Sequence, residues 1–204
     1  MGYGTLNYKE SEGAKWVVGG ELELSSGATF TNKAGDNVTE ANIGAASSGS
    51  TAVEYGDGSS HKTVLTVAAF TQAIAGAALG FGKELYTFPE GMIKVEYATI
   101  DLTLTAATET GTPDVGLGTV VASGVIDVLS GTATFEDIMD GFTATAITSG
   151  GSDSNNYVAA EAGVLDGHTT AKKVFLNLAE TWTATESVTI EAVVTVFWKF
   201  LGDY

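Results

Sequence analysis

The sequence predicts an all-β chain, namely a jelly-roll-like antiparallel β-sandwich with an extended N-terminal arm. Three observations lead to this fold class. Hydrophobic residues make up 44% of the 204 residues and charged residues 17%, which suits a packed chain rather than a disordered one. Apolar residues alternate with a period of two through most of the sequence after residue 61, and turn residues recur at short intervals. A chain of this length suits one sandwich or barrel domain with an appendage.

Residues 1–60 are predicted to form the arm, because they are rich in Gly, Ser, Thr, Ala and Asn and have few long apolar runs. Within the arm, the alternating segment 16–24 predicts a strand pair, and its apolar pattern recurs six residues later at 28–30. Both a hairpin and one or two coils of a β-helix-like stalk produce this spacing, and the hairpin is favoured. Residues 35–60 are expected to be a long connection that needs an outside partner to become ordered.

The body is predicted to span residues 61–204. In chain order we expect strands at 62–75, 83–88 and 92–106, a loop at 111–114, a strand at 118–128, a short helical turn at 135–141, a strand at 142–148, an exposed loop at 150–156, and strands at 173–182 and 187–201. About eight strands with bulged corners favour a jelly roll, and an immunoglobulin-like sandwich is the alternative.

The third of these strands is predicted to contain an irregularity. The apolar residues from Ile93 to Tyr97 share one parity, whereas those from Ile100 to Leu104 share the other. A period of two cannot change phase without an extra residue. We therefore expect a β-bulge or bend at Ala98–Thr99.

The last two strands are predicted to form the centre of the core. Between residues 187 and 201 one face is entirely apolar: Val188, Ile190, Ala192, Val194, Val196, Trp198 and Phe200. Burial of these side chains contributes on the order of 10 kcal/mol before conformational entropy is subtracted. Trp182 and Trp198 both lie on apolar strand faces and are expected to be core residues.

The charge and composition exclude several classes of protein. The formal net charge is −16, and all nine basic residues are lysines. Without arginine the chain lacks the forked donor that commonly binds phosphates and guanine edges, so direct nucleic-acid binding is not expected. The acidic surface keeps a crowded protein soluble, and it also disfavours a position that faces nucleic acid. Both explanations remain open.

The sequence has no cysteine, which excludes disulfides and thiolate chemistry. It contains no apolar run of 18 residues or more, the minimum for a membrane-spanning helix. Residues 1–15 lack a basic start followed by an apolar stretch. Neither a membrane span nor a signal peptide is therefore expected.

The sequence contains no credible set of catalytic residues, so an enzyme is not predicted. Nucleophilic catalysis needs a base beside the nucleophile, but His61 and His168 both adjoin hydroxyl-rich turns and are interpreted as loop histidines. No Gly-x-Ser-x-Gly elbow surrounds a serine. Glu136, Asp137 and Asp140 form a cluster of the kind that glycosidases use in pairs, but a solvated helical turn explains them better.

Neither a metal nor a cofactor is predicted. The segments 55–58 and 153–156 contain oxygen ligands suited to Ca²⁺, but neither follows the Asp-x-Asp-x-Asp-Gly pattern that ends in a bidentate Glu. The glycine-rich stretch 76–82 lacks the Lys-Ser ending of a phosphate-binding loop. Polar and flexible loops explain these segments better.

The arm contains the residues most suited to a partner interface. Trp16 lies in a polar segment with little local core to join, and Trp anchors are enriched at interfaces. Trp16, Leu22, Leu24 and Phe30 are therefore predicted to pack against a neighbouring subunit, and packing within the arm is the alternative.

Six short sequence segments with turn and strand character are spread over most of the chain. They are 15–22 (KWVVGGEL), 56–58 (GDG) with His61, 85–91 (LYTFPEG), 112–118 (TPDVGLG), 131–138 (GTATFEDI) and 197–202 (FWKFLG). In these segments the chain resembles small structural proteins of tailed phages. The resemblance implies a virion component on the head that works as a homo-oligomer, and trimers are usual for cement proteins that sit where capsomers meet. No active-site residues come with this resemblance.

Three functions follow as hypotheses. The first is a capsid decoration or cement protein on the outer face of the virion; its body would form a homotrimer, and its arm would contact neighbours and the major capsid protein to bridge capsomers. The second is a tail-fibre or receptor-binding protein, with residues 1–60 as the stalk and the loop 148–157 for recognition. The third is a carbohydrate-binding module, which requires exposed aromatic residues on a sheet face, where the pattern places mostly buried ones.

Overall fold

A computed structural model describes residues 43–56, 59–147 and 163–203, together with the backbone of five strands outside these ranges. The chain divides into two compact units, Met1–Thr39 and Glu40–Tyr204. Among the described residues, no helix is long and apolar enough to cross a membrane.

The first unit contains two short antiparallel strand pairs. β1 (Tyr8–Lys9) pairs with β2 (Trp16–Val17), and β3 (Phe30–Thr31) pairs with β4 (Asn37–Val38). β2 was expected to pair with the residues that follow it, but its partner is the preceding β1. The favoured hairpin would pair residues 22–24, which lie outside the described residues, with 28–30, and it stays a prediction; Phe30 itself stands opposite Val38.

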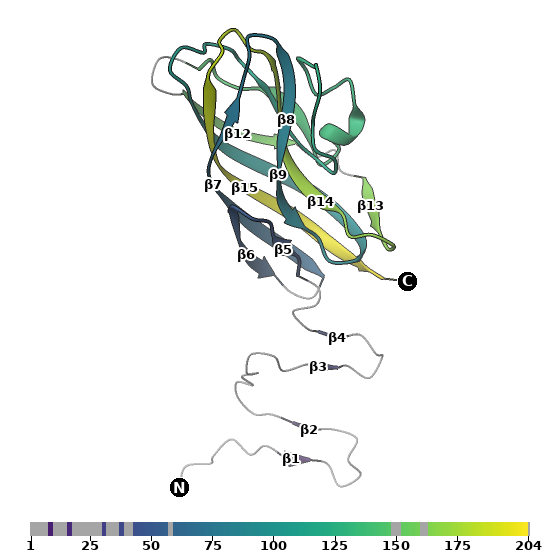
Figure 1. The fold of residues 1–204 in the computed structure, drawn as a ribbon. Helices are drawn as coiled ribbons and strands as arrows, with labels where there is room; N and C mark the ends of the chain where they lie inside the picture. Colours follow the sequence, from purple (N-terminus) through teal and green to yellow (C-terminus); the bar gives the residue numbers. More distant parts are fainter. Residues whose placement is uncertain are drawn as a thin grey trace, which may run out of the picture. The chain divides into compact units, whose positions relative to one another are not determined.

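The second unit consists of two antiparallel sheets packed as a sandwich (Figure 1). The five-stranded sheet has the order β11 (Met139–Thr143), β10 (Asp114–Gly118), β14 (Lys173–Thr181), β8 (Ala78–Thr87) and β5 (Ala45–Ala46). The six-stranded sheet has the order β12 (Ser152–Ala159), β9 (Gly91–Thr105), β15 (Ser187–Gly202), β7 (Ser60–Ala73) and β6 (Ser50–Gly56), and β13 (Val164–Gly167) also pairs with β9.

The connections make this sandwich a jelly roll. β12 and β13 pair with successive parts of β9 and together form one position, so β7 to β15 fill eight positions in chain order. One sheet contains the first, eighth, third and sixth positions, and the other contains the second, seventh, fourth and fifth. This is the double Greek-key order of a jelly roll. The predicted fold class is confirmed.

The compact body begins earlier than the predicted boundary at residue 61. β6 pairs with β7 along its whole length, from Ser50 opposite Val67 to Gly56 opposite His61. β5 extends the other sheet at the edge of β8. The expectation that residues 35–60 need an outside partner is therefore wrong for residues 50–56, whose backbone hydrogen bonds are made within the chain.

The core lies between the two sheets and is centred on β15, as predicted. Val188, Ile190, Val194, Val196 and Trp198 are at most 1% exposed, Ala192 is buried, and Phe200 packs partly buried against them. Trp182 is also buried, and its indole Nε1–H donates to the carbonyl of Leu79. Both tryptophans are therefore core residues.

The predicted bulge in β9 exists, but it lies two residues earlier than expected. The register with β15 runs from Phe197 opposite Tyr97 directly to Trp198 opposite Val95, which leaves Glu96 as the extra residue. The inner face therefore continues at Ala98, which is fully buried. As a result, Tyr97 faces outward instead of sharing the inward parity of Val95.

The segment between β10 and β11 differs most from prediction. The strand expected at 118–128 is a loop, the helical turn is a 3₁₀ turn at η2 (Ala133–Phe135), and β11 replaces the strand expected at 142–148. This segment, residues 119–138, covers the outer face of the five-stranded sheet through a second small cluster of Ala122, Leu129 and Ala179. The exposed loop expected at 150–156 contains most of β12, which pairs with β9.

Candidate functional site

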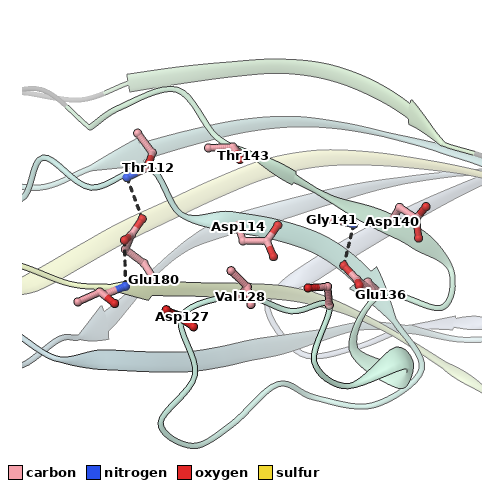
Figure 2. Close-up of a pocket in the computed structure, with 11 residues that line it drawn as sticks. Thr112, Asp114, Asp127, Val128, Glu136, Asp140, Gly141, Thr143 and Glu180 are labelled. Carbon is pink, nitrogen blue, oxygen red and sulfur yellow. Dashed lines mark hydrogen bonds between the residues drawn. The ribbon is translucent and has the colours of Figure 1, made fainter.

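A cavity lies on the outer face of the five-stranded sheet, where residues 119–138 meet it (Figure 2). It has a volume of about 640 Å³. Carboxylates dominate its lining: Asp114 from β10, Asp127 and Glu136 from the covering loop, Asp140 from β11 and Glu180 from β14. We call this feature the acidic cavity.

Three of these carboxylates accept hydrogen bonds from nearby backbone N–H groups. Asp114 Oδ2 accepts from Leu129 N at 2.7 Å, and Glu136 Oε2 accepts from Gly141 N at 2.9 Å. Glu180 accepts from two backbone amides, those of Thr112 and Thr181. Figure 2 shows the hydrogen bonds of Glu136 and Glu180 as dashed lines. The carboxylates therefore tie the covering loop and the strand ends together.

A glycine allows two of the carboxylates to approach each other. A β-carbon at Gly141 would lie 2.6 Å from both Asp114 Oδ1 and Glu136 Oε2, which is closer than any real contact.

Burial raises the pKa of both Asp114 and Glu136, and for Glu136 the negative charges of Asp114 and Asp140 add to the effect. Burial also raises the pKa of Glu180, and the charges of Glu109 and Asp127 contribute.

The sequence cluster Glu136, Asp137 and Asp140 is divided by the fold. Asp137 accepts hydrogen bonds from the backbone N–H and the hydroxyl of Thr119, both at 2.6 Å, and only the other two line the cavity. Sequence reasoning missed Asp114 and Glu180, because they come from strands far apart in the chain. Among the described residues, no group of three or more His, Asp or Glu side chains could hold a metal ion.

His61 belongs to a second polar cluster, at the end of the core. Its Nδ1 lies 3.0 Å from Glu54 Oε1, and its ring stacks on Trp198 with centroids 4.0 Å apart. Thr63 Oγ1 donates to Glu54 Oε2 and accepts from Trp198 Nε1. The prediction of a loop histidine is therefore wrong here, because His61 is a buried residue of β7.

The geometry around His61 differs from that of a catalytic triad. A carboxylate orients its Nδ1, but its Nε2 is buried with no hydrogen-bond partner among the described residues, whereas a triad places the nucleophile there. His168 does lie in a bend as predicted, exposed and 3.0 Å from Asp203 Oδ1. The prediction that the chain is not an enzyme stays a prediction.

A row of aromatic residues crosses the outer face of the six-stranded sheet. Tyr55, Lys62, Phe197 and Tyr97 are opposite one another in register on β6, β7, β15 and β9. Lys62 Nζ lies 5.1 Å from the centroid of the Tyr55 ring, and the rings of Phe197 and Tyr97 stack with centroids 4.0 Å apart. The Tyr55 residue is 54% exposed. We call the three aromatic residues Tyr55, Phe197 and Tyr97 the aromatic row; Lys62 lies between Tyr55 and Phe197.

A shallow depression of about 260 Å³ lies beside the aromatic row and is lined by Tyr55, Lys62, Glu96 and Phe197 among others. Glu96, the bulged residue of β9, accepts a 2.6 Å ion pair from Lys199. Sequence reasoning missed this row because Tyr97 was assigned to the inner face and Tyr55 to a connection.

The predicted interface residues are not brought together in the described part of the chain. Trp16 and Phe30 lie in β2 and β3, but their side chains, and all of Leu22 and Leu24, lie outside the described residues. The same holds for Asp57 and Gly58 and for the side chains of residues 153–156, which were weighed as calcium ligands. These expectations stay predictions.

Comparison with known proteins gives no significant match to this chain. No protein-family model matches the chain. No curated protein and no solved structure matches it significantly.

Proposed function

We propose that this chain is a structural protein of a tailed-phage virion, a decoration or cement protein on the outer face of the capsid. The observation that carries the proposal is the combination of a jelly-roll body with a separate N-terminal unit, Met1–Thr39. Jelly rolls occur in capsid proteins but also in lectins and cupins, so the fold alone does not assign a function. The short segments that resemble tailed-phage structural proteins favour a role in the virion.

In this proposal the two units have different tasks. The body forms a homotrimer where capsomers meet, and the N-terminal unit contacts the major capsid protein and neighbouring copies through Trp16, Leu22, Leu24 and Phe30. Each such contact adds interface area, and a few buried aromatic anchors supply much of the binding energy. The net charge of −16 opposes contact with packaged DNA and is compatible with the outer face.

Binding to empty capsids that lack the chain tests this proposal. We expect the full-length chain to co-sediment with them, and the double variant Trp16→Ala/Phe30→Ala to bind at least about tenfold more weakly, because hot-spot aromatics are lost. Val125→Ala is the matched control, because Val125 is 86% exposed on the body. Its binding should equal that of the unchanged chain.

Limited proteolysis gives a second readout of the same proposal. Cleavage within residues 1–39 should be slower on capsids than in free protein, because docking buries the chain. Equal cleavage rates in the two states, or equal capsid binding by the double variant and the control, would count against the proposal. Binding to tails instead of capsids would favour the fibre hypothesis.

A further inference from the structure

We propose that the aromatic row and the lysines beside it bind a glycan that contains carboxylated sugars. This inference goes beyond the proposed virion role and does not depend on it, because a glycan can be bound from any location that is exposed to one. It starts from the aromatic side chains that the fold leaves on the outside of the six-stranded sheet.

The aromatic row presents one well-exposed ring, that of Tyr55, on which a sugar ring can pack, with the stacked Phe197–Tyr97 pair nearby. Neighbouring strands are 4.7–4.9 Å apart, so a row across four strands extends roughly 15 Å. Tyr55 stands on one side of Lys62, and the stacked Phe197–Tyr97 pair stands on the other. One face of a sugar ring consists of C–H groups and can pack on an aromatic ring, as other apolar groups do. The sugar hydroxyls remain free for polar contacts.

The depression beside the row supplies those polar contacts. At about 260 Å³ it is slightly smaller than sites for drug-sized ligands, so it suits one or two sugar rings. Its lining places Lys62 as a donor and Glu96 as an acceptor near the rings of Tyr55 and Phe197. Alternating hydroxyls of a sugar need both kinds of partner.

The charges of this region favour an anionic sugar over a neutral one. Lys62, Lys94 and Lys199 lie at this end of the same face, and Lys199 stands directly opposite Lys94 in the register of β15 and β9. Like charges directly opposite each other destabilise a sheet. Glu96 pairs with Lys199, whereas within the described ranges neither Lys62 nor Lys94 has a carboxylate partner. A carboxylated ligand would relieve this repulsion.

Two other occupants suit the region less well. A nucleic acid brings one phosphate per nucleotide to a chain with a net charge of −16 and no arginine, and the overall field opposes it. A second copy of the chain in a two-fold contact would set the lysines of each copy near those of the other, and juxtaposed like charges disfavour association. A sparsely charged glycan has neither difficulty.

The test measures binding of the full-length chain to oligosaccharides of neutral sugars that contain a single galacturonic, glucuronic, mannuronic or sialic acid, each beside its neutral methyl ester. We expect binding to at least one acid form, weakened by added salt. Tyr55→Ala should weaken it about tenfold, because a stacking surface is lost. Val53→Ala is the matched control, since Val53 is 50% exposed and occupies the preceding outward position of β6; its affinity should not change.

A second pair of variants tests the charge. Lys62→Gln should weaken binding of the acid form about threefold or more and reduce the salt dependence. Lys83→Gln, which removes a lysine that lies 5.3 Å from the ring of Phe70, should not. Circular dichroism confirms that each variant is folded.

Four results of the binding measurements would overturn the proposal. They are an absence of binding to every acidic oligosaccharide, equal binding of acid and methyl ester, equal affinities of Tyr55→Ala and Val53→Ala, and tighter binding of an oligothymidylate than of any acid sugar. A change of oligomeric mass in Tyr55→Ala without a change in glycan affinity would identify the row as a contact between copies, and would also overturn it.

Discussion

The carboxylates at the strand ends fall into two groups, because their surroundings shift their pKa values in opposite directions. Glu109 accepts hydrogen bonds from the backbone N–H groups of Thr110, Gly111, Thr183 and Ala184. Burial on its own raises the pKa of Glu109, but the hydrogen bonds outweigh it, and the net pKa lies below its ordinary value. The pKa of Glu186 is also lowered, first by the backbone N–H of Thr108. These two residues join the loops that follow β9 and β14.

The acidic cavity shows the reverse case. Burial raises the pKa of Asp114, Glu136 and Glu180, because too few N–H donors compensate for lost solvation and for neighbouring negative charges. A group whose pKa is raised on folding contributes stability that is fully present below the unfolded pKa and is lost as the pH rises through the folded pKa. At neutral pH these three residues therefore oppose folding.

Glu136→Gln is predicted to stabilise the fold at neutral pH. Glutamine keeps an oxygen that can accept from Gly141 N–H and removes the charge beside Asp114 and Asp140. The urea midpoint should rise at about pH 7, and the gain should shrink as the pH falls to about 4, where the carboxyl of the unchanged chain becomes protonated. Glu191→Gln, at an exposed position of β15, is the control; an equal gain there at neutral pH would contradict the local explanation.

At the scale of elements, the segment 119–138 lies on the five-stranded sheet because the sheet provides space and hydrogen bonds for it. A β-carbon at Gly118 would lie 2.4 Å from the backbone of residues 134–135, so only glycine permits the approach. Asn177, fully buried on β14, accepts from Ala122 N and donates to the carbonyls of Val120 and Phe135. One side chain thus takes the place of a missing strand partner.

Asn177→Leu is predicted to destabilise the body by about 3 kcal/mol or more. The shape changes little, but the backbone groups of Ala122, Val120 and Phe135 lose their partners, and each unsatisfied buried group costs about 1–3 kcal/mol. Urea unfolding measures the loss. Gln72→Leu makes the same exchange of an amide for an apolar side chain, where the hydrogen bond is exposed, and should cost less than about 0.5 kcal/mol. Equal losses would show that Asn177 does not hold the segment.

The strands whose faces differ most in polarity were the ones that the sequence predicted correctly. β15 alternates strictly, so both its limits and its inner face follow from a period of two. The existence of a bulge in β9 could be predicted from the sequence, but its exact position could not, because Tyr97 is apolar enough to fit either face of the sheet. The position of Glu96 becomes visible only through the partner strand.

Other elements had no such signal. β6 was missed because an edge strand with small and polar residues resembles a connection. The strand predicted at 118–128 was wrong because Val120, Val121, Val125 and Val128 give a loop the β-branched composition of a strand. Asp114 and Glu180 could not be grouped from sequence, since only the pairing of β10 with β14 brings their strands together. The acidic cavity was therefore not predictable, and the aromatic row was only partly so.

At the scale of the whole molecule, the acidic cavity and the aromatic row lie on opposite outer faces of the sandwich. The acidic cavity lies on the five-stranded sheet, and the aromatic row with its lysines lies on the six-stranded sheet. Such an arrangement gives one jelly roll two outer faces of different chemistry.

Electron cryomicroscopy of virions of the phage that encodes this chain would locate the protein. A decoration protein should give density with the shape of the jelly-roll body on the outside of the head, in groups of three where capsomers meet, with the N-terminal residues in contact with the major capsid protein. Density for the body on the tail, inside the head, or nowhere on the particle would contradict the proposed role.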